Sequence, residues 1–197
     1  MEAVAKQFAN FGDYRREKEH SNSDDRYEIV DGVSVWMGPA PGETHQIVVG
    51  EFFALIRNHL VGKTCRAFAA PYDVILVEEG EDEDEAQTVL QPDITVICDQ
   101  SKRRQYGCLG APDLVVEVLS PYSALRDIRT KRIIYERHGV SEYWIVNPQH
   151  RLVNILRLEQ GRYAETVFSP EDGILTSSVL PELQIDLEAV FAQIEER

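Results

Sequence analysis

The sequence lacks several features that would each place it in a defined class of protein. It has no run of about 18 apolar residues, so we expect no transmembrane helix and no membrane partner. Residues 1–20 carry charges of both signs without a long apolar segment, so we expect no secretory signal. Internal repeats and low-complexity linkers are also absent, and a length of 197 residues is typical of one domain.

Signatures of several enzyme classes are missing as well. No G-x-S-x-G motif and no paired Cys–His signature indicates a serine or cysteine hydrolase. No phosphate-binding P-loop or dinucleotide fingerprint is present. The three cysteines, Cys65, Cys98 and Cys108, include no C-x-x-C pair, which argues against a zinc site. Their odd number and wide spacing favour reduced thiols and therefore a cytoplasmic protein.

Positive charge is scarce. The 20 Lys and Arg residues are outnumbered by 34 Asp and Glu residues, and the net charge is −14. This balance argues against indiscriminate binding to nucleic acid. The charge is uneven, because residues 78–85 contain seven acids whereas residues 102–137 contain eight Lys or Arg and four acids. Two interpretations stay open: a solvated surface with a mobile acidic loop, or a basic rim around a site for a polyanion.

The hydrophobic pattern predicts an α/β or α+β domain with a mixed sheet, because its helical and strand-like segments follow one another along the chain. Residues 1–25 are read as a helix or a frayed arm. The other expected elements are a hairpin turning at Asp31-Gly32, a helix over 45–60 capped by Thr44, strands over 72–79, 93–99 and 113–120, a helix over 123–139 capped by Ser120 or Ser123, a strand over 142–147, a hairpin turning at Gly161 and a short helix near the C-terminus.

One strand carries a carboxylate where an apolar side chain is expected. In "PDLVVEVLSP", residues 112–121, Glu117 lies among valines and leucines. An unpaired ionised carboxylate in a dry core costs several kcal/mol. Three explanations stay open: an ion pair with an arginine, a position at a strand edge facing water, or a ligand of a metal ion alongside other carboxylates.

Further acids near Glu117 strengthen the metal interpretation. Asp93 begins the preceding strand, and Asp113 begins the strand of Glu117. If the two strands are neighbours, Asp93 and Glu117 can approach each other on one face. Asp113 lies four residues before Glu117 and therefore points the same way. Carboxylate oxygens favour Mg²⁺ or Mn²⁺ over Zn²⁺.

Lys131 is the candidate charge stabiliser for such a site. It lies about 15 Å along the predicted helix from Pro121. Glu117 lies about 10 Å back along the strand from Ser120. If the helix folds back along the strand, the lysine side chain can span the remaining gap. The alternative is an ordinary surface pair with Asp127, four residues before Lys131 on the same helix.

The order of these motifs resembles that of the Uma-type family of restriction endonucleases, within the PD-(D/E)xK nuclease superfamily. The matching stretches are "YEIVDG" (27–32), "GETHQ" (42–46), "QPDITV" (91–96), "PDLVVEVLSP" (112–121), "DIRTK" (127–131), "HGVSEYWIVNP" (138–148) and "LPELQIDLEAVF" (180–191). The resemblance implies a restriction-endonuclease-like mixed sheet with flanking helices and an added N-terminal hairpin. Residues 24–197 would form this nuclease domain, and residues 1–23 an N-terminal arm or helix.

The resemblance also implies roles for individual residues. Asp93 and Glu117 correspond to the metal ligands, and the metal would be Mg²⁺ or Mn²⁺. The superfamily places a lysine two residues after the second acid, where this chain has Leu119, so that role falls to Lys131. Glu28, in "YEIVDG", is either a further ligand or water-orienting group, or an ordinary solvent-facing residue.

His45 stands in the matched "GETHQ" and would contact a phosphate or cap its helix. Tyr135, Tyr143 and Trp144 are interpreted as packing residues.

Two functions follow as hypotheses. The first is a cytoplasmic, metal-dependent endonuclease that hydrolyses DNA phosphodiester bonds with an Asp/Glu/Lys site, acting as a homodimer to cleave both strands. The second is a non-catalytic dimeric module on the same fold, which binds nucleic acid or has a regulatory role. The net charge of −14 favours the second, whereas the ordered Asp–Glu–Lys set favours the first.

Overall fold

The computed structural model describes residues 7–20, 25–120 and 124–194. The helices are α1 (Phe11–His20), α2 (Glu43–His59), α3 (Ala124–His138) and α4 (Leu187–Phe191), and three short 3-10 turns are η1 (Glu83–Glu85), η2 (Gln100–Lys102) and η3 (Pro170–Asp172). The strands are β1 (Tyr27–Val30), β2 (Val33–Trp36), β3 (Arg66–Ala69), β4 (Asp73–Leu76), β5 (Thr88–Leu90), β6 (Ile94–Ile97), β7 (Gly107–Leu109), β8 (Leu114–Val118), β9 (Glu142–Asn147), β10 (Leu152–Glu159), β11 (Arg162–Phe168), β12 (Ile174–Thr176) and β13 (Gln184–Asp186).

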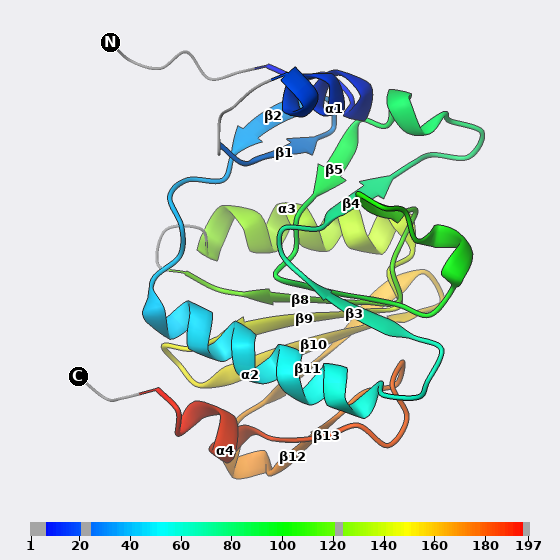
Figure 1. Ribbon diagram of the computed structural model, residues 1–197. Helices are drawn as coiled ribbons and strands as arrows, with labels where there is room; N and C mark the ends of the chain where they lie inside the picture. Colours follow the sequence, from blue (N-terminus) through cyan, green and yellow to red (C-terminus); the bar gives the residue numbers. More distant parts are fainter. Residues whose placement is uncertain (1–6, 21–24, 121–123, 195–197) are drawn as a thin grey trace.

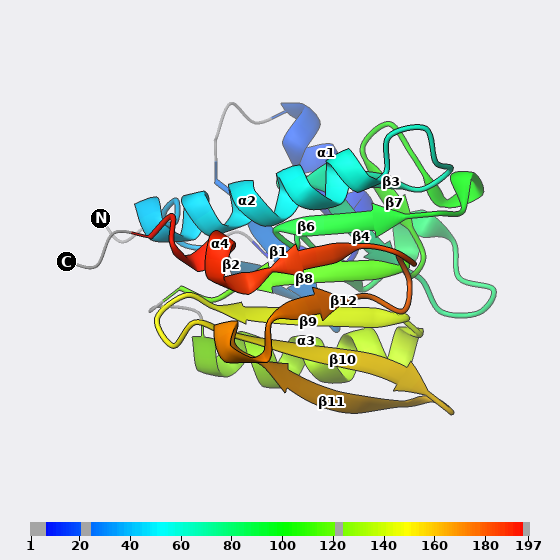
Figure 2. The ribbon, with the colours of Figure 1, turned by 90° about the horizontal axis from the view of Figure 1, so that it is seen from below.

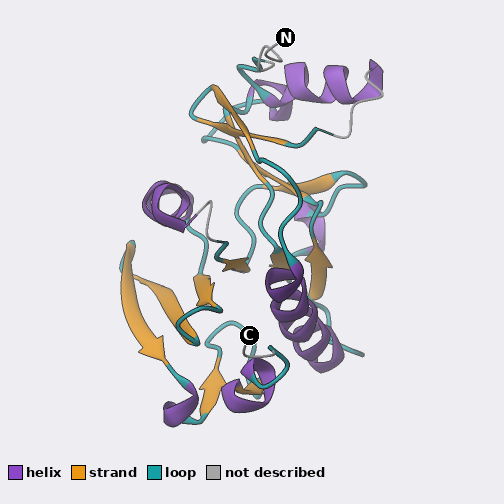
Figure 3. Cartoon of the chain, turned by 90° about the vertical axis from the view of Figure 1, so that its left-hand side faces the viewer, coloured by secondary structure: helices purple, strands orange, loops and turns teal. Residues whose placement is uncertain are grey.

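The elements form layers, and the expected α+β class with mixed sheets is confirmed. A five-stranded sheet has the order β2-β1-β5-β4-β7, and a six-stranded sheet has the order β11-β10-β9-β8-β6-β3. From top to bottom, Figure 1 shows α1, the five-stranded sheet, α3, the six-stranded sheet and α2 with α4. Viewed from the side in Figure 3, α1 lies beyond the strands at the end of the molecule away from α2.

The N-terminal region packs on the outer face of the five-stranded sheet. Phe11 and Tyr14 of α1 are almost fully buried against Ile29, Ile75 and Val89. The hairpin turns at Asp31 and Gly32, as expected, and both residues have positive φ, as a type I′ turn requires. The predicted boundary between residues 23 and 24 lies outside the described residues and stays a prediction.

The six-stranded sheet holds the two strands that carry the candidate acids. Neighbouring β6 and β8 are antiparallel, and β8 is parallel to β9 through the crossover helix α3. Figure 2 shows β6, β8, β9, β10 and β11 side by side in that order. Side chains of β8 alternate between the two faces: Val116 packs under α2 with Phe52, whereas Val115 packs with Ile134 of α3. Glu117 therefore points toward α3.

Several local details differ from the sequence-based expectations. Gly42, not Thr44, precedes the first turn of α2. The predicted cap residue Ser123 lies outside the described residues. Strands β3, β5 and β7 were not expected, because each has only three or four residues and gives too short a pattern.

The expectation of three reduced thiols is wrong in the structure. Cys65 and Cys98 form a disulfide that links the start of β3 to the end of β6, and Cys108 is a buried free cysteine. Because β3 and β6 pair antiparallel, these two cysteines are brought together across a separation of 33 residues.

Within the described residues, no helix combines the length and the apolar character needed to cross a bilayer.

A buried carboxylate at the start of β9 connects the C-terminal segment to the sheet. Glu142 is fully buried and accepts hydrogen bonds from Arg157 Nε (3.0 Å), the Ser178 backbone N–H and the hydroxyls of Ser177 and Ser178. Removing one partner of a buried ion pair leaves the other charge uncompensated.

We expect Glu142→Ala to lower the free energy of unfolding by about 3–5 kcal/mol, because Arg157 and the donors of Ser177 and Ser178 then lose a fully buried acceptor. Urea unfolding at constant protein concentration measures the change. The exposed Glu159 is the control, and Glu159→Ala should change stability by less than about 0.5 kcal/mol. A loss for Glu142→Ala no larger than for this control would contradict the structural role.

Candidate active site

The two acids of the sequence motifs face each other across neighbouring strands. The β6–β8 register pairs Ile94 with Val116, and one further step places Asp93 opposite Glu117. Opposite residues of an antiparallel pair point to the same face. Asp93 Oδ2 accepts a hydrogen bond of 2.8 Å from the backbone N–H of Val118, which fixes its carboxylate beside the strand of Glu117.

Lys131 reaches this pair from α3. Its Nζ donates to Glu117 Oε1 at 2.9 Å, and only 8% of the lysine side chain is exposed. The helix therefore folds back along the strand as the distance argument required. The alternative of an exposed pair with Asp127 does not apply, because Lys131 is buried. The side chain of Asp127 lies outside the described residues.

Glu28 of β1 contributes a further carboxylate from the five-stranded sheet. Its Oε1 lies 2.8 Å from Lys131 Nζ, and it is 5% exposed. The interpretation of Glu28 as a solvent-facing strand residue is therefore wrong. Lys131 joins the two sheets at this point, because its ammonium contacts one acid from each.

The site holds more negative than positive charge. The carboxyl groups of Glu28 and Glu117 contact one lysine, and that of Asp93 lies opposite Glu117. Burial, together with the charges of Asp93 and Glu28, raises the pKa of Glu117 to about 8 despite the nearby ammonium. Burial by itself would lower the pKa of Lys131, but Glu117 and Glu28 raise it well above its ordinary value. The two acids therefore favour the charged form of Lys131, and one ammonium faces more than one carboxyl group.

Two further side chains contact the acids. The imidazole Nε2 of His45, in the first turn of α2, lies 3.2 Å from Asp93 Oδ2, and its Nδ1 is buried without a hydrogen-bond partner among the described residues. The hydroxyl of Tyr135 donates to Glu117 Oε1 at 3.2 Å. Tyr135 is one helical turn beyond Lys131, and this spacing was the available sign that it faces the same acid.

The donor set fits a small hard cation. Asp93 Oδ1 and Glu117 Oε2 have no hydrogen bond to another described residue, whereas the other oxygen of each carboxylate is held in place. The described residues contain no group of three or more His, Cys, Asp or Glu that could hold a metal ion. An ion at this site would therefore have Asp93 and Glu117 as its two protein ligands. Mg²⁺ typically takes one or two protein carboxylates and keeps several waters. The surplus negative charge also favours a divalent cation.

The other candidates lie elsewhere. Asp113 accepts a hydrogen bond from the Cys98 backbone N–H at the opposite end of β8, so sharing a face with Glu117 does not bring it to the site. Asp113 instead borders a separate surface pocket of about 580 Å³ with Arg157. Tyr143 and Trp144 are buried core residues, as expected.

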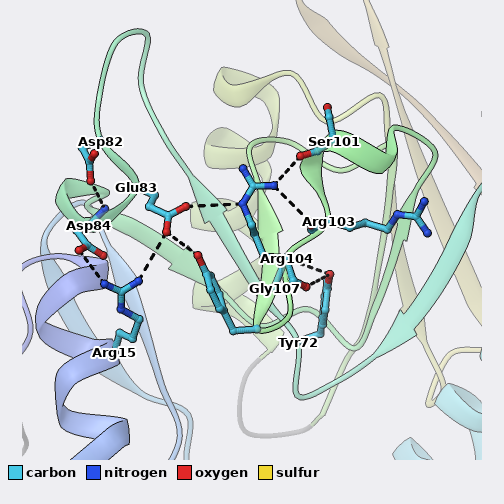
Figure 4. Close-up of polar contacts among 10 residues, drawn as sticks. Arg15, Tyr72, Asp82, Glu83, Asp84, Ser101, Arg103, Arg104 and Gly107 are labelled. Carbon is cyan, nitrogen blue, oxygen red and sulfur yellow. Dashed lines mark hydrogen bonds and ion pairs between the residues drawn. The ribbon is translucent and has the colours of Figure 1, made fainter.

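Part of the basic stretch is paired with acids of the same chain. Figure 4 shows Arg15 of α1 between Glu83 and Asp84, with Arg104 directed at Glu83. Arg15 lies 2.8 Å from Asp84 and 3.6 Å from Glu83, and Arg104 lies 3.8 Å from Glu83. The acidic stretch is thus ion-paired at η1. Arg132 and Arg137 likewise contact Glu165 and Asp31, which reduces the basic surface available to a polyanion.

Comparisons with known proteins agree with this architecture. A family described as Uma2, "Putative restriction endonuclease", matches residues 11–188. A crystal structure described as a putative nuclease belonging to DUF820 from Anabaena variabilis superposes with a TM-score of 0.70 at 22% identity, over 87% of this chain and 93% of that chain. This similarity shows a common fold.

An uncharacterized protein of Synechocystis sp. is 26% identical over 122 residues, which span 62% of this chain and 60% of that protein. The chain therefore matches about three fifths of the length of this relative.

Proposed function

The chain belongs to the Uma2 family of restriction-endonuclease-like proteins, and we propose that it is a metal-dependent endonuclease that hydrolyses DNA phosphodiester bonds. One observation carries the proposal: Asp93 and Glu117 stand opposite each other on β6 and β8, and Lys131 lies 2.9 Å from Glu117. In this proposal Asp93 and Glu117 hold Mg²⁺ or Mn²⁺, and Lys131 and Glu28 complete the catalytic set.

The bound ion would supply a Lewis acid and lower the pKa of a water molecule. Lys131, in its charged form, offsets negative charge that develops on the phosphate oxygens. The carboxylates of Glu117 and Glu28 raise the pKa of Lys131, which favours its charged form for this role. Glu28 and Tyr135 fix the ammonium and the Glu117 carboxylate, respectively, so that neither has to reorganise during the reaction.

A test of the proposal is cleavage of plasmid and single-stranded DNA in Mg²⁺ or Mn²⁺, with EDTA as the metal-free arm. We expect cleavage with metal and none with EDTA. Nucleic-acid binding that weakens with salt, needs no metal and is not followed by cleavage would instead favour the non-catalytic module. The ion pairs that occupy Arg104, Arg132 and Arg137 reduce the basic surface available to nucleic acid and therefore weigh against tight binding in either case.

Asp93→Asn should abolish measurable Mn²⁺ binding in calorimetric titration, because an amide oxygen replaces a charged ligand. The matched control is Asp99→Asn. Asp99 is an exposed acid that follows the same strand and bonds to Ser101. Equal Mn²⁺ affinity in both variants would show that Asp93 is not a ligand of the metal ion.

The assembly and compartment are further parts of the proposal. Cleavage of both strands of a duplex requires two sites, so we propose a homodimer that acts on DNA. The cytoplasmic location stays a prediction, and the Cys65–Cys98 disulfide weighs against it. Sedimentation velocity, with and without duplex DNA, distinguishes a dimer from a monomer. Competition between DNA and RNA of one sequence tests the substrate.

A further inference from the structure

Gln91 lies immediately before the segment that carries the first metal ligand. The order is Gln91-Pro92-Asp93, between β5 and β6, and Gln91 is 2% exposed. The proline ring confines the residue before it to an extended backbone. The position of the Gln91 backbone is therefore coupled to that of Asp93, two residues further along.

The backbone of Gln91 contacts Glu28, the acid that forms an ion pair with Lys131. Its N–H donates to Glu28 Oε1 at 3.0 Å, the same oxygen that lies 2.8 Å from Lys131 Nζ. One peptide group thus orients the carboxylate on which the catalytic lysine rests. A displacement of this segment would move Glu28 and Asp93 together.

The side chain of Gln91 anchors that segment to two elements outside the site. Its Nε2 donates to Asp73 Oδ1 of β4 at 2.6 Å and lies 3.1 Å from the Tyr14 hydroxyl of α1. Asp73 is 6% exposed and Tyr14 1% exposed, so water does not compete for these contacts. Lys18 of α1 lies 4.0 Å from Asp73 Oδ2 and covers the ring of Tyr14 at 4.7 Å.

A buried glutamine at this position has an energetic disadvantage. Its Oε1 is buried and has no hydrogen-bond partner among the described residues. An apolar side chain would avoid that penalty, although it would also remove the amide donor of the buried Asp73. Residues retained at a cost in stability are typical of functional sites.

We propose that Gln91 is a positioning residue that couples α1 and β4 to the metal ligand Asp93 and to the Glu28–Lys131 pair. The catalytic role of this coupling rests on the proposed function. The coupling itself can be measured without metal or DNA. It makes the N-terminal helix part of the site, although α1 supplies no group to the reaction.

The test exchanges the amide and the carboxylate of the Gln91–Asp73 pair. Gln91→Glu places two carboxyl groups at hydrogen-bond distance, and at alkaline pH, where both are ionised, their repulsion should displace the segment. Gln91→Glu combined with Asp73→Asn restores an amide–carboxylate bond of reversed direction at the same net charge. Asp73→Asn alone leaves an acceptor for the Gln91 amide and is the control. Circular dichroism and thermal unfolding verify that each variant is folded.

Two measurements follow on the folded variants. Calorimetry with Mn²⁺ should show affinity reduced by roughly 10- to 100-fold in Gln91→Glu and restored to within about threefold in the double variant. Acetic anhydride labelling with peptide mass spectrometry should show Lys131 protected in the wild type, labelled faster in Gln91→Glu and protected again in the double variant. The exposed Lys63 serves as the internal reference.

The labelling needs neither metal nor cleavage. If the wild type binds no Mn²⁺ and cuts no DNA, the proposed function fails, while the labelling of Lys131 still decides on the coupling. A lower unfolding midpoint with unchanged Lys131 labelling and unchanged Mn²⁺ affinity would reduce Gln91 to a structural role and overturn the inference. If Gln91→Glu does not fold, Gln91→Met removes the side-chain contacts without adding charge, and faster Lys131 labelling is again the expected result.

Discussion

Lys131→Met is expected to reduce the rate of the proposed metal-dependent DNA cleavage by about 10²–10³-fold, the usual effect of removing one preorganised charge stabiliser. The same change should lower the free energy of unfolding of the metal-free protein by about 3–5 kcal/mol, since the buried Glu28 and Glu117 lose their shared counter-charge. Cleavage rates at saturating metal and urea unfolding in EDTA measure the two effects.

The response to metal separates a catalytic from a structural lysine. If Asp93 and Glu117 bind the ion, removal of the ammonium leaves both ligands present, so Mn²⁺ should still bind. It should then restore part of the lost stability, because a ligand that binds only the folded state shifts unfolding by mass action. Lys63→Met, at an exposed position, should leave both cleavage and stability unchanged. Full cleavage by folded Lys131→Met would remove this lysine from the mechanism.

The central geometry was predictable because it depends on period and order. The apolar runs around Asp93 and Glu117 define two consecutive strands, and antiparallel pairing of such strands places the acids opposite each other. Lys131 could be assigned because helix and strand have fixed rises per residue, which makes the fold-back distance calculable. The turns at Asp31-Gly32 and Gly161 were readable from residues that tolerate positive φ.

The contacts around that centre could not be predicted, because they depend on packing between elements far apart in the chain. Gln91 and Tyr14 are 77 residues apart, and no local pattern relates them. His45 was noticed as a motif residue, but its contact with Asp93 depends on the angle at which α2 meets the sheet. The Cys65–Cys98 disulfide follows from the β3–β6 pairing, and β3 was itself too short to be recognised.

Asp113 shows that strand alternation predicts the face on which a side chain lies but not its distance from the site. Alternation correctly assigns it to the same face as Glu117, but four residues of strand span about 13 Å. That distance is too large for two side chains to share one ion at about 2.0–2.1 Å from each ligand oxygen. Face and proximity are separate conditions, and only opposite residues on paired strands, such as Asp93 and Glu117, meet both.

Glu117→Gln is expected to abolish Mn²⁺ binding and to reduce cleavage by about 10³-fold or more, since a charged ligand worth several kcal/mol is lost. The shape and the contacts of the side chain are nearly preserved, because the amide oxygen can still accept from Lys131 and Tyr135. Calorimetry and the plasmid assay measure the loss, and Glu171→Gln at an exposed position is the control.

The stability of this variant should move in the opposite direction to its function. The pKa of Glu117 is raised from an ordinary 4.5 to about 8, chiefly by burial. Between these values the folded state holds a proton that the unfolded state releases, so the stability of the metal-free wild type falls as pH rises through this window. Glu117→Gln lacks this titration. In EDTA, its free energy of unfolding relative to the wild type should therefore increase from about pH 5 to about pH 8.

The combination of outcomes identifies the role of the carboxylate. If the carboxylate of Glu117 served the fold alone, Glu117→Gln would lower the free energy of unfolding and leave the Mn²⁺ affinity unchanged. If the carboxylate serves a bound cation, it destabilises the metal-free protein and stabilises the metal-bound protein. Glu117→Gln should then be more stable than the wild type in EDTA, and Mn²⁺ should stabilise only the wild type. If Mn²⁺ stabilises Glu117→Gln as much as the wild type, the ion is bound elsewhere and Glu117 is not its ligand.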